Sequence, residues 1–196
     1  MTYQGYYVFD VRPLKSPEPG MDFLNEYVLV GNQIQQQAKY SHKLTERTLK
    51  FSYLQSSATE REWYRRFFDS YKGRYGKFWV PSWKRDYSLA VAAAPGASQF
   101  RCVQAFRSSA LRGYKRHLYI PTDSSLCTKI QAVSSNLGEE VITINPYFVN
   151  GLVIVGEIMD LYLCRFDDDS FRCEMVDNGA WSQVQFSFQE LQKETP

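Results

Sequence analysis

The sequence SATEREWYRRFFDSYKGRYGKFWVPSWKRDYSL, residues 57–89, decides much of the fold because it joins a helix to an aromatic strand. Ser57 and Glu60 have the S-x-x-E spacing of a capping box, in which each residue satisfies a backbone N–H at the start of a helix. Gly73 follows as a residue that readily ends a helix. The pattern predicts a helix over residues 57–73.

Aromatic side chains recur along one side of this predicted helix. Trp63, Phe67 and Tyr71 follow one another at a spacing of four residues, whereas arginines occupy the other side. Aromatic residues at strict helical spacing favour burial in a core. We therefore expect this face to pack on a sheet that contains Leu49, Phe51 and Trp79. Interleaved aromatic and basic residues are also typical of surfaces that bind nucleic acid, but such a surface needs its rings to face outward.

The rest of the chain is predicted to be mostly strand. Residues 39–54 alternate over their second half, with Leu49, Phe51 and Tyr53 on one face. Prolines follow a β-prone start in residues 1–22, so we expect a loosely structured arm that crosses onto a neighbour. Further strands are expected at residues 23–30, 77–83, 88–94, 99–106, 117–121, 129–134, 140–145, 152–166, 171–176 and 181–191.

The expected fold class is mainly β, a β-rich α+β fold made of two small β modules. Residues 1–85 and 161–196 would form a split barrel or sandwich that carries the helix. Residues 86–160 would form an inserted small β-barrel, with Trp83 at the hinge between the modules. Turn residues separate the short strands of this insert at the spacing found in all-β folds.

Charge is unevenly distributed along the 196 residues, although the formal net charge is only +2. Residues 39–86 hold 12 Lys and Arg against 5 Asp and Glu, whereas residues 157–196 hold 3 against 9. Such segregation either stabilises the fold within one chain or creates two patches that meet on neighbouring copies. The candidate contacts between subunits are Arg61, Arg65, Arg66, Asp167, Asp168 and Asp169.

The sequence has no motif of a hydrolase, a kinase or a zinc protease, and we expect neither an enzyme nor a cofactor. Residues 167–169 lack the glycine and glutamate of a calcium loop, which favours a solvated turn. The cysteines form no C-x-x-C pair, so buried free thiols in a reducing compartment are expected, and their spacing gives little support to an iron–sulfur site. No membrane span or signal peptide is expected either. The four cysteines are Cys102, Cys127, Cys164 and Cys173.

The order of these features resembles phage tail-tip proteins of the distal tail protein class. A strand, a capped helix, a glycine break and the run FWVPSW at residues 78–83 are similar to the N-terminal half of that class. The sequences LCRFDDD at residues 163–169, DNG at 177–179 and VQFSF at 184–188 resemble the end of similar tail proteins. The resemblance extends from about residue 24 to the end of the chain.

The resemblance implies a structural protein of a long-tailed phage or prophage, made in the host bacterial cytoplasm and located at the virion tail tip. Such proteins form a hexameric ring, a baseplate component that contacts the tail tube protein, the tip hub and receptor-binding or side-fibre proteins. It implies no membrane and no specific nucleic acid. Some related tip proteins bind an iron–sulfur cluster through C-terminal cysteines, a feature not carried over because only Cys164 and Cys173 lie near this end. The alternative function is a nucleic-acid-binding module that uses the basic residues 39–86 and 107–116.

Overall fold

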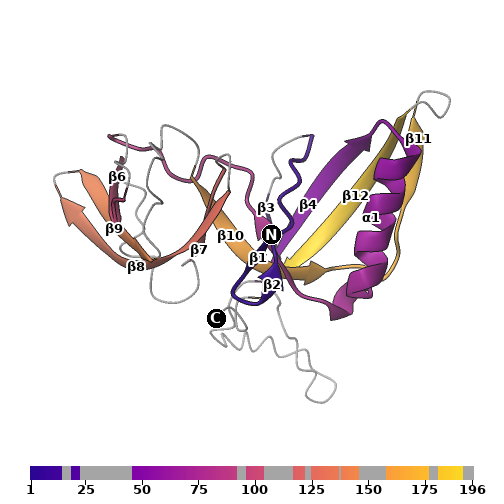
Figure 1. The fold of residues 1–196 in the computed structure, drawn as a ribbon, viewed down its shortest axis with the longest axis horizontal. Helices are drawn as coiled ribbons and strands as arrows, with labels where there is room; N and C mark the ends of the chain where they lie inside the picture. The colour runs from indigo at the N-terminus through magenta and orange to yellow at the C-terminus, as the bar shows by residue number, and fades with distance from the viewer. Residues whose placement is uncertain are drawn as a thin grey trace, which may run out of the picture.

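The computed structural model describes residues 1–14, 19–22, 46–91, 96–103, 117–121, 125–136, 138–145, 158–176 and 181–191. Two groups of strands lie on either side of a shared strand, β10, and a single α-helix among these residues covers one group (Figure 1). A mainly β fold with one helix is therefore confirmed. The expected strand at 23–30 lies outside the described residues. The elements are β1 (Thr2–Tyr3), β2 (Tyr6–Tyr7), β3 (Pro19–Asp22), β4 (Glu46–Gln55), α1 (Ala58–Tyr71), the short 3-10 helix η1 (Gly73–Tyr75), β5 (Phe78–Pro81), β6 (Gln99–Val103), β7 (His117–Ile120), β8 (Leu126–Asn136), β9 (Glu139–Asn145), β10 (Met159–Phe166), β11 (Cys173–Val176) and β12 (Trp181–Glu190).

Helix α1 begins and ends where the sequence predicts. The Ser57 hydroxyl accepts a hydrogen bond from the Glu60 N–H at 3.2 Å, which is the expected cap. The Glu60 carboxylate reaches back to the Ser56 N–H at 2.7 Å, one residue earlier than in a standard capping box. At the other end, Lys72 adopts the left-handed conformation with φ of 51° and Gly73 follows with φ of 58°. Two successive residues with positive φ stop the helix.

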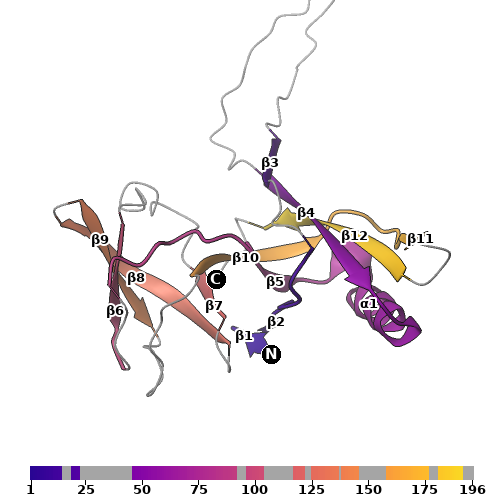
Figure 2. The ribbon, with the colours of Figure 1, turned by 90° about the horizontal axis from the view of Figure 1, so that it is seen from above.

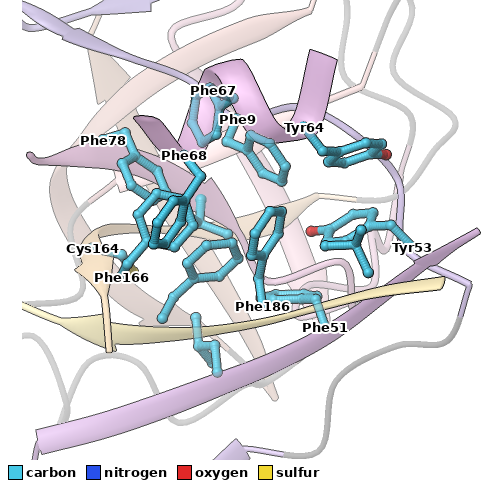
Figure 3. Close-up of a cluster of buried hydrophobic side chains, with 14 of the residues drawn as sticks. Phe9, Phe51, Tyr53, Tyr64, Phe67, Phe68, Phe78, Cys164, Phe166 and Phe186 are labelled. Atoms are coloured by element: carbon cyan, nitrogen blue, oxygen red, sulfur yellow. The ribbon is translucent and has the colours of Figure 1, made fainter. Parts of the chain in front are cut away.

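The sheet beneath α1 is antiparallel and follows the predicted alternation. Strand β12 pairs with β4 over almost its whole length, with Phe186 opposite Phe51 and Phe188 opposite Leu49. Alternate residues of both strands are buried against the helix, and the intervening residues face away from it. The resulting core is mostly rings (Figure 3), and its buried members are Phe9, Leu49, Phe51, Tyr53, Tyr64, Phe67, Phe68, Phe78, Val80, Tyr162, Cys164, Phe166, Val184, Phe186 and Phe188.

Two tryptophans do not lie where the sequence pattern predicts. Trp63 is 40% exposed, and Tyr64, Phe67 and Phe68 are the helix residues buried in the core. At roughly 100° per residue the aromatic stripe is wider than one buried face, so Trp63 is left at its edge. Trp79 is fully buried, but on the opposite side of β5 from its neighbours in the ring core. Side chains alternate along a strand, so Phe78 and Val80 reach the ring core and Trp79 cannot.

The N-terminal segment packs on its own chain. The prediction of a loosely structured arm is therefore wrong for residues 1–14. Strands β1 and β2 form a small hairpin, and the Phe9 N–H then donates to the Trp79 carbonyl at 2.8 Å. The Phe9 ring is fully buried in the ring core, with its centroid 4.7 Å from that of Phe67. Residues 1–14 therefore complete the core of the first module.

The second group of strands forms a curved sheet in the order β10-β7-β8-β9-β6 (Figure 2). Its buried core is mainly aliphatic and consists of Tyr87, Phe100, Cys102, Leu118, Ile120, Ile130, Ile142, Ile144 and Ile158. The described strands do not close into the barrel expected for this region. Among the described residues, isolated bridges from Tyr87 to Ile158 and from Leu89 to Cys102 connect residues 87–89 to both ends of the sheet.

Strand β10 belongs to both groups. Its first residues, Met159 and Asp160, pair with β7, whereas Leu161 to Cys164 pair with β5. The predicted division at residue 160 falls within this strand and stays a prediction. A third buried cluster fills the space where the two groups meet, and its members are Val8, Trp79, Tyr119, Cys127, Met159, Leu161, Leu163 and Leu191.

Candidate interaction surfaces

The solvent-facing side of α1 carries the predicted basic residues. Arg65 and Arg66 are exposed, and each has an acidic neighbour one helical turn away. Arg66 Nε lies 3.0 Å from a Glu62 carboxylate oxygen, and Arg65 Nε lies 3.8 Å from one of Asp69. Exposed pairs of this kind contribute little to stability. The arginine side chains are therefore available to a partner at small cost to the fold.

Two shallow hollows flank the exposed Trp63 side chain on this helix. One has a volume of about 360 Å³ and lies between α1 and Tyr7 of β2. The other, of about 420 Å³, lies toward the start of α1. Trp63 and Arg66 line both hollows. The indole stacks on Phe67, with ring centroids 5.8 Å apart and planes 13° apart. We call this surface the Trp63 face; its other lining residues are Tyr7, Ala58, Thr59, Glu62, Phe67, Ser70 and Tyr71.

The acidic turn at residues 167–169 is hydrogen-bonded within its own chain. Asp169 Oδ1 accepts from the Arg74 N–H at 2.9 Å, and Asp167 Oδ2 accepts from the Ser187 hydroxyl at 3.1 Å. These bonds tie the turn to η1 and to β12. Asp168 is exposed, and hydrogen bonds from the hydroxyl and N–H of Ser170 hold its pKa below the usual value.

The contacts of this turn bear on the predicted interface between subunits. Gly73 approaches Asp169 so closely that an added Cβ would lie 2.5 Å from the carboxylate. The turn therefore meets the chain just after α1, at Arg74, and these hydrogen bonds do not involve Arg61, Arg65 or Arg66. A role of the three arginines and the three aspartates between subunits stays a prediction.

A cleft of about 420 Å³ opens beside the acidic turn. It lies along β12 between the part that pairs with β10 and the part that pairs with β11. Phe68, Phe166 and Phe186 contribute apolar surface to its lining. Charged residues of both signs also line it. Its remaining lining residues are Lys50, Phe51, Ser52, Asp168, Ser170, Arg172, Glu174, Gln183, Gln185 and Ser187.

A buried carboxylate, which the sequence patterns did not identify, connects the two groups of strands. Asp160 is 1% exposed and accepts hydrogen bonds from the hydroxyls of Tyr87 and Tyr162, each at 3.0 Å. Its backbone N–H donates to Asp86 Oδ2 at 2.9 Å. The Ser82 hydroxyl donates to the same oxygen of Asp86. This network fixes residues 82–87 against β10; a lone aspartate within the apolar run IMDLYL was its only sequence signal.

A buried histidine anchors the N-terminal hairpin to the second group of strands. His117 of β7 is 1% exposed, and its Nδ1 lies 3.0 Å from the Tyr3 hydroxyl. Trp79 packs beside the imidazole with centroids 4.7 Å apart, and its indole N–H donates to the Tyr3 carbonyl at 2.9 Å. Burial raises the pKa of Tyr3 above its usual value. Sequence reasoning missed this contact because Tyr3 and His117 are distant in the chain.

The four cysteines are free thiols, and Cys102, Cys127 and Cys164 are buried. Burial raises the pKa of Cys127 to about 12 and also raises that of Cys164. Thiols with raised pKa values are poor nucleophiles. In the described part of the chain, no three His, Cys, Asp or Glu residues are grouped so that they could hold a metal ion.

Two sequence expectations involve parts of the chain outside the description. The basic segment 107–116 lies there, as do residues 39–45 of the other basic segment.

Among the helices that are described, none has the length and apolar character needed to cross a membrane. No protein-family model matches the chain, and no curated protein matches it.

Proposed function

We propose that this chain is a structural component of a phage tail tip, where it forms an oligomeric ring. The ring joins the tail tube to the tip or baseplate hub and to receptor-binding proteins. The observation that carries the proposal is the Trp63 face. A 40% exposed tryptophan, flanked by tyrosines and by Arg66, has the composition of the residues that dominate protein–protein interfaces.

The placement of the resembling motifs also supports this proposal. The helix, the FWVPSW run and the sequences at residues 163–169 and 184–188 come from distant parts of the chain, yet each contributes side chains to one core. Phe67 of α1, Phe78 of β5 and Phe166 of β10 are mutual ring neighbours, with centroid distances of 5.0 to 5.9 Å. The residues that carry the resemblance therefore act together as one packed unit, as expected if they are the module shared with tail-tip proteins.

The test of assembly is direct. The purified chain is analysed by size-exclusion chromatography with light scattering over a range of concentrations, at low and at high salt. We expect self-association, a hexameric mass at high concentration and ring-shaped particles by electron microscopy. A chain that stays monomeric at every concentration and in both salts contradicts the proposed ring. Co-purification with the tail tube protein and the tip hub then tests the partners.

The same preparation tests the nucleic-acid alternative. Contacts of Lys and Arg with phosphates release counterions, so such binding weakens steeply as salt increases. The helix arginines lie beside acidic residues, and the aromatic core residues face inward. We therefore expect at most weak, non-specific binding of labelled duplex and single-stranded DNA. Nanomolar, salt-sensitive binding would favour the alternative over the tail-tip proposal.

A further inference from the structure

A second exposed apolar surface lies at the turn end of the β11–β12 pair, where Val176 ends β11 and Trp181 begins β12. Val176 and Trp181 are opposite each other across the two strands, and they are 41% and 42% exposed. Leu54 of β4, which pairs with Gln183, is 41% exposed. Met175 is 63% exposed on the other side of β11. We call these four residues the hairpin end.

The hairpin end differs in place and shape from the Trp63 face. Residues that are paired across a sheet share one face, so Leu54, Val176 and Trp181 lie on the face of the sheet that α1 does not cover. Strand β11 pairs with β12 within this sheet, along the edge opposite β4. The Trp63 face is hollowed on both sides of its indole, whereas the hairpin end is the margin of a sheet. The Trp63 face is therefore suited to receive side chains of a partner, and the hairpin end is suited to insert its side chains.

Arg66, which is paired with Glu62, and Glu174 supply opposite charges beside the two surfaces. Arg66 lines both hollows of the Trp63 face, and Arg65 is exposed on the same helix. Beside the hairpin end, Glu174 is exposed on the same sheet face as Trp181. Glu174 pairs with Gln183, which lies two residues after Trp181 on β12 and therefore on the same face. A carboxylate at the margin of an apolar contact and a guanidinium at the margin of the opposing one favour a single relative orientation.

We propose that the Trp63 face of one copy receives the hairpin end of the next copy, a deduction that rests on the proposed ring. Because the two surfaces are different, the contact is head-to-tail, and an open assembly keeps one free surface of each kind at its two ends until the ring closes. The acidic turn at 167–169 is hydrogen-bonded within its own chain, whereas the hairpin end leaves large apolar side chains exposed to water. The hydrophobic part of the interface therefore comes from the hairpin end.

The experiment uses one change on each surface. Trp63→Ala alters the receiving surface and Trp181→Ser the inserting one; Arg66→Glu is a second receiving-surface change that leaves the core rings intact. Tyr75→Ser is the matched control because Tyr75 is an aromatic residue, 84% exposed, outside both surfaces. Circular dichroism and melting curves check that each variant is folded. We expect each surface variant to weaken self-association by about tenfold or more and the control to leave it unchanged.

Mixing distinguishes a head-to-tail contact from a like-on-like contact. Trp63→Ala retains a normal hairpin end, and Trp181→Ser retains a normal Trp63 face. An equimolar mixture should therefore form a species with the mass of two chains that neither variant forms alone at that concentration. If either variant assembles like the wild type, or if the mixture contains only monomers, the head-to-tail contact is wrong while the ring stands. If the wild-type chain itself never associates, the ring and the contact both fail.

Discussion

The two cores of this chain are built from different side chains. Under α1 the core consists mostly of rings, and the Phe67 ring alone has the rings of Phe9, Phe78 and Phe166 within 5.9 Å. In the second group of strands the core is mainly isoleucine and leucine, and its described residues include the ring pair of Tyr87 and Phe100, 6.3 Å apart. Rings bury a large area but must meet at particular angles, whereas β-branched chains fit a curved sheet with few constraints. The first core should therefore tolerate truncation less well.

The largest expected effect is on the ring core. Phe67→Ala should lower the free energy of unfolding by about 3–5 kcal/mol, because it removes a buried ring and leaves a cavity. Ile142→Val, in the aliphatic core, should cost only about 0.5–1.5 kcal/mol. Denaturant unfolding followed by tryptophan fluorescence and by circular dichroism measures both. If Phe67→Ala is thermally silent, the aromatic face of α1 is not a core.

The next effect concerns the polar network between the two cores. Asp160→Asn replaces one accepting oxygen by an amide donor, which disturbs a hydrogen bond from Tyr87 or from Tyr162. We expect a loss of about 1–3 kcal/mol in the free energy of unfolding, as found for buried groups that lose their partner. Asp168→Asn at the exposed turn is the control and should cost much less. Equal losses in the two variants would mean that Asp160 does not connect the cores.

The sequence predicted those parts of the fold that depend on near neighbours. The cap at Ser57 and the alternation along β4 each involve residues within a few positions of one another, so their patterns are visible in one dimension. Phe9 was missed because its burial depends on β5, α1 and β12, which are distant in the chain. The exposure of Trp63 was missed because the aromatic stripe is wider than the face that the sheet can cover.

The interaction surfaces depend even more on distant residues. Arg65 and Arg66 were predicted to face solvent from helical spacing alone, and they do. One of the two hollows beside Trp63 requires Tyr7, which the sequence placed in a loose arm. The hydrogen bond from Arg74 to Asp169 joins residues almost a hundred positions apart, so no local sequence pattern predicts it.

A smaller effect concerns the start of α1, which covers the ring core. Ser57→Ala removes the side chain that accepts from the Glu60 N–H and should lower the free energy of unfolding by about 1 kcal/mol.

Hydrogen bonds from the Ser56 N–H and hydroxyl lower the pKa of Glu60 below its ordinary value of 4.5. A lowered folded-state pKa stabilises the fold above the unfolded-state pKa, and this contribution is lost as the pH falls through the folded-state value. Melting curves of the wild type and Glu60→Gln should therefore converge below pH 4.5. A gap that widens in acid would contradict this assignment.

The smallest effect is expected on the outer side of α1, where the same helix that covers the ring core carries its exposed arginines. Replacing both Arg65 and Arg66 by Ala should change the free energy of unfolding by less than about 1 kcal/mol, because each exposed pair one turn apart contributes only about 0.2–0.5 kcal/mol. Arg101→Ala on β6, exposed in the second group of strands, is the control and should be equally silent. Chemical unfolding measures stability, and light scattering of the same samples measures self-association. The double variant should unfold like the wild type yet associate more weakly, since Arg66 lines both hollows of the Trp63 face. If it instead unfolds the monomer while Phe67→Ala does not, the inner and outer faces of α1 are assigned the wrong way round.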